Sequence, residues 1–291
     1  MSPTHGPIVP RKRLGTELKR LRDESDRTLD EVAHTLMIST SKLSRLENAQ
    51  GSPQARDVRD LAVYYEVAET ALGERLMRWA REGRRQGWWA DYDEVIHRNE
   101  SFDTYLAYET EATIARVYTI PYVTGLLQTA DYTRALTSAM WRWNTDKEVD
   151  RLVQVRLRRQ QGLTHREGLP PLELRAILHE SCLTQFVGSA EIMRAQLETL
   201  LKAPSMFPKV DLRVLPASAE PHQMNTCTWS YFMFSDSLDR DVVHLETHAG
   251  YRHIESDEQV KRYDRGFEEL SRHSLIPEES NDLIRSVLRN S

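Results

Sequence analysis

The N-terminal part of the chain carries short apolar stripes at helical spacing. A first helix is predicted over 14–24, because three leucines recur on one side of it: Leu14, Leu18 and Leu21. A second helix is predicted to begin after Thr28, since Thr28 and Glu31 have the spacing of a capping box. A third begins after Ser39. Such short helices in close succession predict a compact all-α bundle.

Two further helices complete this pattern. One is predicted to start at the dipeptide Ser52-Pro53, where the serine would cap the helix and the proline would take its first position. The other runs from 71 to about 98 and is rich in arginine and tryptophan. We interpret this second segment as one connecting helix that packs on the next domain.

The hydrophobic period changes in the second half of the chain. Helical patterns occur at 104–116, 128–140, 148–163, 189–201, 258–271 and 277–288. Strand-like alternation occurs at 172–178, 210–215, 228–234 and 242–246. We therefore predict an N-terminal all-α bundle and a C-terminal mixed α+β domain. The expected boundaries are a flexible tail at 1–10, the bundle at 11–72, a connecting helical segment at 73–100 and the mixed domain at 101–291.

The composition is that of an ordinary soluble globular protein, with 40% hydrophobic and 29% charged residues among 291. No apolar run approaches the roughly 18–20 residues of a membrane span, and positions 1–10 lack the apolar stretch of a signal peptide. We expect a cytoplasmic, nucleoid-associated protein with two reduced thiols, Cys182 and Cys227. The net charge is −5, yet basic residues crowd the start of the chain. This distribution is typical of a small DNA-reading module carried by a larger body.

The segment from Thr28 to Asn48 has the order helix, tight turn, helix, which places the second helix in the major groove of DNA. Leu43 and Leu46 form the buried side of that second helix. Its other sides carry small hydroxyl or basic side chains: Thr40, Ser41, Lys42, Ser44 and Arg45. Hydroxyls can approach base edges, and an arginine can reach a guanine or a phosphate. The alternative is a bundle that no longer touches DNA, whose surface polar residues are simply solvated.

The stretch from Ser41 to Asn48 reads SKLSRLEN and resembles the recognition helix of the Cro/cI-type family, also called XRE or lambda-repressor-like. The resemblance implies that Thr40, Ser41 and Arg45 read bases. It also implies that Thr28 and Asn48 hold the DNA backbone.

Two positions depart from that family. Leu29 stands where the family often has a glutamine that contacts phosphate, and Met37 stands where the turn usually has glycine. A left-handed conformation costs a residue other than glycine roughly 1–2 kcal/mol, so a remodelled turn is an alternative. Neither departure removes the base-reading side of the helix.

The rest of the chain resembles the effector domain of a large actinobacterial regulator family, which joins a Cro/cI-type head to this domain and includes WhiJ-like, antitoxin-like regulators. The motifs that carry this resemblance are Glu109-x-Glu111-Ala112, Gly125-Leu-Leu-Gln-Thr-x-Asp-Tyr132, Arg156-x-x-Arg-Gln160, Leu178-His-Glu180, Gln196-Leu197, Val214-Leu-Pro216 and Val243-His-Leu-Glu246. Thr124 stands where the family generally has proline. The resemblance implies sensing or binding of a small partner protein encoded nearby, and not catalysis.

A catalytic alternative rests on two groups of residues. On one strand face, His244, Glu246 and His248 could hold a divalent metal, with His222 and His253 in support. The simpler interpretation is a polar strand face in which Glu246 makes an internal hydrogen bond. Ser181-Cys182 beside His179 suggests a nucleophile, but no orienting acid stands at a telling spacing. We therefore expect no catalytic residue, no metal and no cofactor.

The sequence thus favours a transcriptional regulator, expected to be a repressor, that binds a double-stranded DNA operator as a homodimer. Its C-terminal domain is expected to receive a small-molecule ligand or a small protein partner. Two alternatives stay open. One is an antitoxin-like protein whose main role is to bind a small partner protein, and the other is a metal-dependent enzyme with a DNA-binding head.

Overall fold

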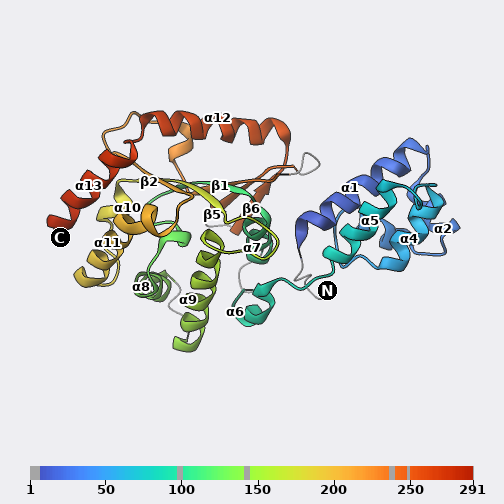
Figure 1. Ribbon diagram of the computed structural model, residues 1–291, viewed down its shortest axis with the longest axis horizontal. Coiled ribbons are helices and arrows are strands. Elements are labelled where there is room, and N and C mark those ends of the chain that lie inside the picture. The colour runs from blue at the N-terminus through green and yellow to red at the C-terminus, as the bar shows by residue number, and fades with distance from the viewer. Residues whose placement is uncertain (1–6, 97–100, 141–144, 236–239, 248–249, 291) are drawn as a thin grey trace. The chain divides into compact units, whose positions relative to one another are not determined.

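The computed structural model describes residues 7–96, 101–140, 145–235, 240–247 and 250–290, and the chain divides into two compact units between Asp91 and Tyr92 (Figure 1). The first unit contains α1 (Ile8–Glu24), α2 (Leu29–Thr35), α3 (Thr40–Glu47), α4 (Ala55–Tyr64) and α5 (Ala71–Glu82). α1 packs against α3 and α5, and α4 packs against α5. Of the leucines predicted to face inward, Leu14, Leu18 and Leu43 are fully buried, whereas Leu46 is only partly buried against the same core. The all-α bundle is therefore confirmed.

Two helices of the first unit begin at other residues than the pattern predicts. α1 begins at Ile8, inside the segment expected as a flexible tail, and it buries Val9 and Pro10. α4 begins at Ala55, so the prediction that Ser52 caps it is wrong. Pro53 is buried instead, and its ring packs close to the end of α5. Tertiary packing here overrides the local capping signal.

The predicted connecting helix is also wrong as a single element. α5 ends at Glu82, and a 3₁₀ turn (Trp88–Tyr92) and the short α6 (Asp93–Ile96) follow. The last two positions of the predicted helix lie outside the described residues. Glycines at 83 and 87 lower the helical propensity of this stretch, and each lies in close contact with neighbouring side chains.

The second unit is built on a six-stranded mixed sheet in the order β3-β2-β1-β4-β5-β6. The strands are β1 (Ile114–Thr119), β2 (Glu173–His179), β3 (Val210–Leu215), β4 (Trp229–Met233), β5 (Val242–Thr247) and β6 (Gly250–Ile254). β1 pairs in parallel with β2, which pairs in parallel with β3. On its other side β1 pairs antiparallel with β4, and β5 and β6 continue antiparallel. The mixed α+β class is confirmed.

Helices cover both faces of this sheet (Figure 1). α12 (Asp257–His273) runs along one face, and Phe267 packs there with Tyr118 and Tyr231 of the strands. The other face carries helices that include α7 (Phe102–Glu111), α8 (Ala130–Met140), α9 (Asp146–Gln160) and α11 (Ala190–Met206). The remaining elements are the short α10 (Ser181–Thr184), the C-terminal α13 (Pro277–Arg289) and 3₁₀ turns at Gly125–Leu127, Gln161–Leu163 and Gln223–Asn225.

Two strands were not predicted. The helix expected over 104–116 ends at Glu111, and β1 begins at Ile114. β1 lies in the middle of the sheet and is buried on both faces, so its sequence does not alternate between apolar and polar residues. β6 likewise lacked a predictive pattern, since arginine and histidine stand among its five residues.

Candidate nucleic-acid interface

The helix-turn-helix is formed by α2 and α3, and local hydrogen bonds define where each helix begins. The Thr28 hydroxyl accepts a hydrogen bond from the Glu31 amide, while the Glu31 carboxylate accepts one from the Thr28 amide at 2.8 Å. Ser39 caps α3 by accepting a hydrogen bond from the Lys42 amide. The predicted capping box and the predicted start of α3 are both confirmed. Thr28 itself is exposed, at the N-terminus of α2.

The turn between the helices is built around Met37, which has a φ of 52° and is 92% exposed. Met37 therefore adopts the left-handed conformation that glycine usually provides at such a turn. Ile38 donates its amide hydrogen to the Ala33 carbonyl and so closes the turn. The chain keeps the turn in spite of the missing glycine.

The predicted contact residues of α3 differ in exposure and in the partners that hold them. Ser41, Arg45 and Asn48 are exposed, whereas Thr40, Lys42 and Ser44 are partly buried. The Asn48 side-chain amide donates a hydrogen bond to the Ser44 carbonyl at 2.8 Å, which folds it back over the end of α3.

Two of the predicted contacts are tied to acidic residues of neighbouring helices. Thr40 donates a hydrogen bond to Asp30 of α2 at 2.6 Å, and the Lys42 ammonium pairs with Asp57 of α4 at 2.7 Å. Sequence reasoning missed both aspartates, because nothing in the local pattern shows which helices meet.

Ser41 and Arg45 lie one turn apart on the exposed side of α3. Within the described residues, neither side chain makes a hydrogen bond or an ion pair. An arginine that no protein group holds can give its full set of donors to a guanine edge or a phosphate. These two side chains are therefore the ones that the fold leaves most available to DNA.

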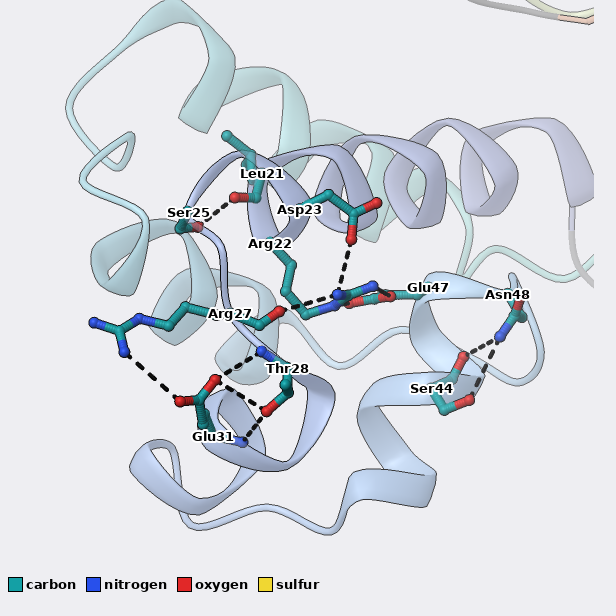
Figure 2. A network of polar contacts seen from close by, with 10 residues as sticks. All are labelled: Leu21, Arg22, Asp23, Ser25, Arg27, Thr28, Glu31, Ser44, Glu47 and Asn48. Carbon is teal, nitrogen blue, oxygen red and sulfur yellow. Dashed lines mark hydrogen bonds and ion pairs between the residues drawn. The ribbon is translucent and has the colours of Figure 1, made fainter.

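An ion pair that the sequence pattern did not reveal fixes the far end of α3. Arg22 of α1 donates two hydrogen bonds to the Glu47 carboxylate, at 2.8 and 3.0 Å, and a third to the Arg27 carbonyl (Figure 2). The Arg22 and Glu47 side chains are 12% and 4% exposed. The hydrogen bonds to Glu47 raise the pKa of Arg22, so the guanidinium stays charged. We call this pair the α1–α3 clamp, because it joins the ends of those two helices.

The basic start of the chain is less free than its composition indicates. Arg22 belongs to the clamp, and Arg20 is paired with Glu17 and Glu24 on the same helix. The Arg11 side chain is buried and donates a hydrogen bond to the Pro7 carbonyl. Much of this positive charge therefore stabilises α1 rather than forming an open basic surface.

Two of the histidines considered as metal ligands lie side by side: His244 of β5 pairs with His253 of β6, and their ring centroids are 5.0 Å apart. His244 is buried in the sheet, Glu246 is exposed, and His248 lies outside the described residues. Both ring nitrogens of His222 are engaged, one with the Met224 amide and one with the Glu269 carboxylate. The described part of the chain contains no group of three His, Cys, Asp or Glu side chains that could hold a metal ion.

The cysteine considered as a nucleophile is buried. The Cys182 thiol lies 3.3 Å from two carbonyl oxygens, those of Thr119 and Tyr122, and burial raises its pKa to about 12. His179 contacts the neighbouring Ser181 hydroxyl instead. A thiol that stays protonated at neutral pH is a poor nucleophile.

Comparison with known proteins agrees with the two-part architecture. A family model described as a helix-turn-helix domain matches residues 13–76, and one described as a domain of unknown function (DUF5753) matches residues 102–286. No curated protein and no solved structure matches the chain. Among the described residues, no helix has the length and apolar character needed to cross a membrane. The chain thus belongs to the DUF5753 family, and its XRE-like N-terminal helix-turn-helix domain indicates a DNA-binding regulator.

Proposed function

We propose that this protein is a sequence-specific transcriptional repressor that reads its operator with α3. The observation that carries the proposal is the exposed pair Ser41 and Arg45, which stands on a helix fixed at its start by Ser39 and at its end by the clamp. A recognition helix needs this combination of rigid support and unengaged donors, because each base contact depends on position within a fraction of an ångström.

The experiment begins with genome-wide mapping of bound sites, followed by affinity measurements on the operator found and on random DNA. Arg45→Ala and Ser41→Ala should each weaken operator binding by about 1–3 kcal/mol and random binding much less. Arg285→Ala, which removes an exposed arginine from α13, is the control. Equal weakening on every sequence would reduce these side chains to phosphate contacts, and no weakening would contradict the proposal.

The repressor is proposed to act as a homodimer on an inverted repeat. α3 has only eight residues and contacts few base pairs, so one module gives too little contact for tight binding. The half-sites should lie about 34–36 Å apart, or a multiple of this distance, so that both recognition helices meet one DNA face. Sedimentation of the protein with and without operator measures the stoichiometry. One chain per operator at saturation would contradict the dimer.

The second unit is proposed to act as a non-catalytic sensor of a small ligand or a small protein partner. Its support is a separate compact unit that follows a complete DNA-reading bundle, together with the protonated Cys182 thiol. Replacing the residues after 101 by an unrelated dimerising zipper should preserve operator binding and abolish the physiological response. A chimera that responds like the intact protein would refute the sensor role. If the role is antitoxin-like, so that the partner complex is the main function, the chimera should also fail to bind the small partner protein.

A further inference from the structure

Two arginines of α9 lie near one another in the second unit, and of these only Arg159 is paired directly with a carboxylate. The charge of the exposed Glu246 acts on the other, Arg156, without forming an ion pair with it. Arg159 of α9 pairs with Glu109 of α7 through two hydrogen bonds of 2.7 Å, and both side chains are about 5% exposed or less. The Tyr105 hydroxyl donates to Glu109 at 2.8 Å and accepts from Arg159 at 2.9 Å. Glu109 is therefore fully engaged by these two partners.

Arg156 lies one turn before Arg159 on α9 and is partly buried. A Cβ on Gly125 would lie 2.1 Å from Nη1 of Arg156 and 3.0 Å from Nη1 of Arg159. The two guanidinium groups thus converge on the same glycine. Among the described residues, Arg156 makes no hydrogen bond or ion pair. Burial, and next the charge of Arg159, lower the pKa of Arg156 to about 10, so the group stays charged at neutral pH.

The loop that carries Gly125 is held in place by glutamine side chains. Gln160 of α9 donates to the Gln128 carbonyl at 2.6 Å, and Gln196 of α11 donates to the Leu127 carbonyl at 2.8 Å. Gln128 donates to the Val123 carbonyl at 2.6 Å. The wall against Arg156 is consequently rigid, and the missing side chain at Gly125 leaves room for the guanidinium group.

Aromatic rings and a histidine lie beside the arginines. The His244 ring centroid is 4.5 Å from that of Tyr105 and 5.0 Å from that of Tyr251, and the Arg159 guanidinium lies over the Tyr105 ring at 5.0 Å. His244 is 4% exposed, and its Nδ1 atom has no hydrogen-bond partner. A buried polar atom without a hydrogen-bond partner costs roughly 1–3 kcal/mol of stability. A cluster that retains such an atom is therefore a candidate ligand-binding site.

We propose that Arg156 and His244 form a binding site for the carboxylate or phosphate group of a small molecule, whose remaining part lies against Tyr105 and Tyr251. An anion would accept the hydrogen bonds that no protein group takes from Arg156, whose charge is otherwise balanced only at longer range by the exposed Glu246, and its oxygens could accept hydrogen bonds from both side chains. The site deepens the sensor role proposed above, and its effect on repression rests on that function. Binding of the anion itself does not depend on the repressor function, because all of the residues involved lie in the second unit.

The test uses the full-length chain and three defined probes: inorganic phosphate, phenyl phosphate and benzoate, each against sodium chloride at equal ionic strength. A ligand that binds only the folded state raises the midpoint of thermal unfolding with its concentration. We expect at least one probe to do so for the natural chain. Arg156→Gln should weaken that probe about tenfold or more. The matched control is Arg158→Gln, which removes an exposed arginine from the same helix and should leave the affinity unchanged. Comparing the probes distinguishes a phosphate ligand from a carboxylate ligand.

A second variant changes Gly125, the residue against which the Arg156 guanidinium lies. Gly125→Ala places a methyl group where the Arg156 guanidinium lies, and the flexible end of that side chain can move away. It should weaken the same probe while Arg156 itself remains. Equal affinities in natural chain, Arg156→Gln and Gly125→Ala, or no shift with any probe, would overturn the proposal. A result of this kind would leave the operator measurements on Arg45 untouched, so failure of the site and failure of the repressor function are distinguishable.

Discussion

Removal of the Glu47 carboxylate tests how the recognition helix is held. In the variant Glu47→Ala, Arg22 keeps its hydrogen bond to the Arg27 carbonyl and its contact with Asp23, but it loses both hydrogen bonds to α3. The mostly buried guanidinium of Arg22 then has no carboxylate partner on α3. We expect the end of α3 to loosen and operator affinity to fall, although Glu47 itself does not touch DNA.

The magnitude follows from burial. Breaking a buried ion pair by removing one partner costs about 3–5 kcal/mol, because the other charge stays desolvated. Arg22 and Glu47 are 12% and 4% exposed, and because Arg22 keeps its ion pair with the exposed Asp23, we expect a loss near the lower end of that range, about 3 kcal/mol. A bundle of this size has a total stability of only about 4–11 kcal/mol at the usual 0.05–0.15 kcal/mol per residue. The substitution thus removes a large part of the stability of the DNA-reading unit.

The assay is hydrogen exchange measured by mass spectrometry on peptides of α1 and α3 in the full chain, which gives a free energy of opening for each segment. Glu24→Ala is the control, since Glu24 pairs with Arg20 on the exposed side of α1. Such a surface pair contributes about 0–1 kcal/mol. The double variant Arg22→Met with Glu47→Leu should recover much of the lost stability, because it buries no unpaired charge. A change in Glu47→Ala no larger than in Glu24→Ala would refute the reasoning.

Three further predictions follow from other contacts. Asp57→Asn releases Lys42, whose ammonium lies 2.7 Å from that carboxylate, so affinity for all DNA should rise and the salt dependence should steepen by about one ion in a titration against salt. Gly15→Ala places a methyl group 2.4 Å from the Glu47 carbonyl oxygen and should destabilise the bundle by about 1–3 kcal/mol in urea unfolding. Brief treatment of the native chain with iodoacetamide at pH 8 should modify the partly exposed Cys227 and spare Cys182, whose pKa burial raises to about 12; mass spectrometry locates the label.

Each of these has a matched comparison. Asp60→Asn removes the same charge from α4 without touching Lys42, and an equal gain in DNA affinity would contradict the release argument. Thr16→Ala changes the exposed neighbour of Gly15 and should be nearly neutral. If Gly15→Ala is equally neutral, α1 and α3 do not approach as closely as described. Rapid labelling of Cys182 in the native chain would contradict its burial.

Signals contained in a few neighbouring residues predicted the local structure well. The capping pattern of Thr28 and Glu31 and the serine at 39 identified the starts of α2 and α3, because a cap is a contact over three residues. The cap predicted at Ser52-Pro53 was wrong, because the proline ring packs near Gly83 and α4 begins two residues later.

Contacts between distant segments were beyond such reasoning. The central strand β1 lacks alternation because both of its faces are buried, so the sequence pattern wrongly extends the preceding helix over its first residues. The partner of Arg22 is twenty-five residues away, and that of Arg159 is fifty. Asp57, which pairs with Lys42, also lies on another helix, so the local pattern does not reveal this contact either. Sequence reasoning could therefore name the side chains of α3 but could not say which of them the fold leaves available.

The strand order also decides when each unit can fold during synthesis. β1 and β2 leave the ribosome early, but the antiparallel neighbour of β1 is β4, whose Met233 pairs with Ile114. The helices before Asp91 need no such late partner to pack against one another. At about 5–20 residues per second, translation of the last two hundred residues takes about 10–40 s. Throughout much of that time the growing chain carries a folded DNA-binding bundle followed by strands with an unpaired apolar edge. Chaperones that bind nascent chains should consequently engage the segment after β1, and ribosome profiling of chaperone-bound complexes would show the contact ending once β4 has emerged.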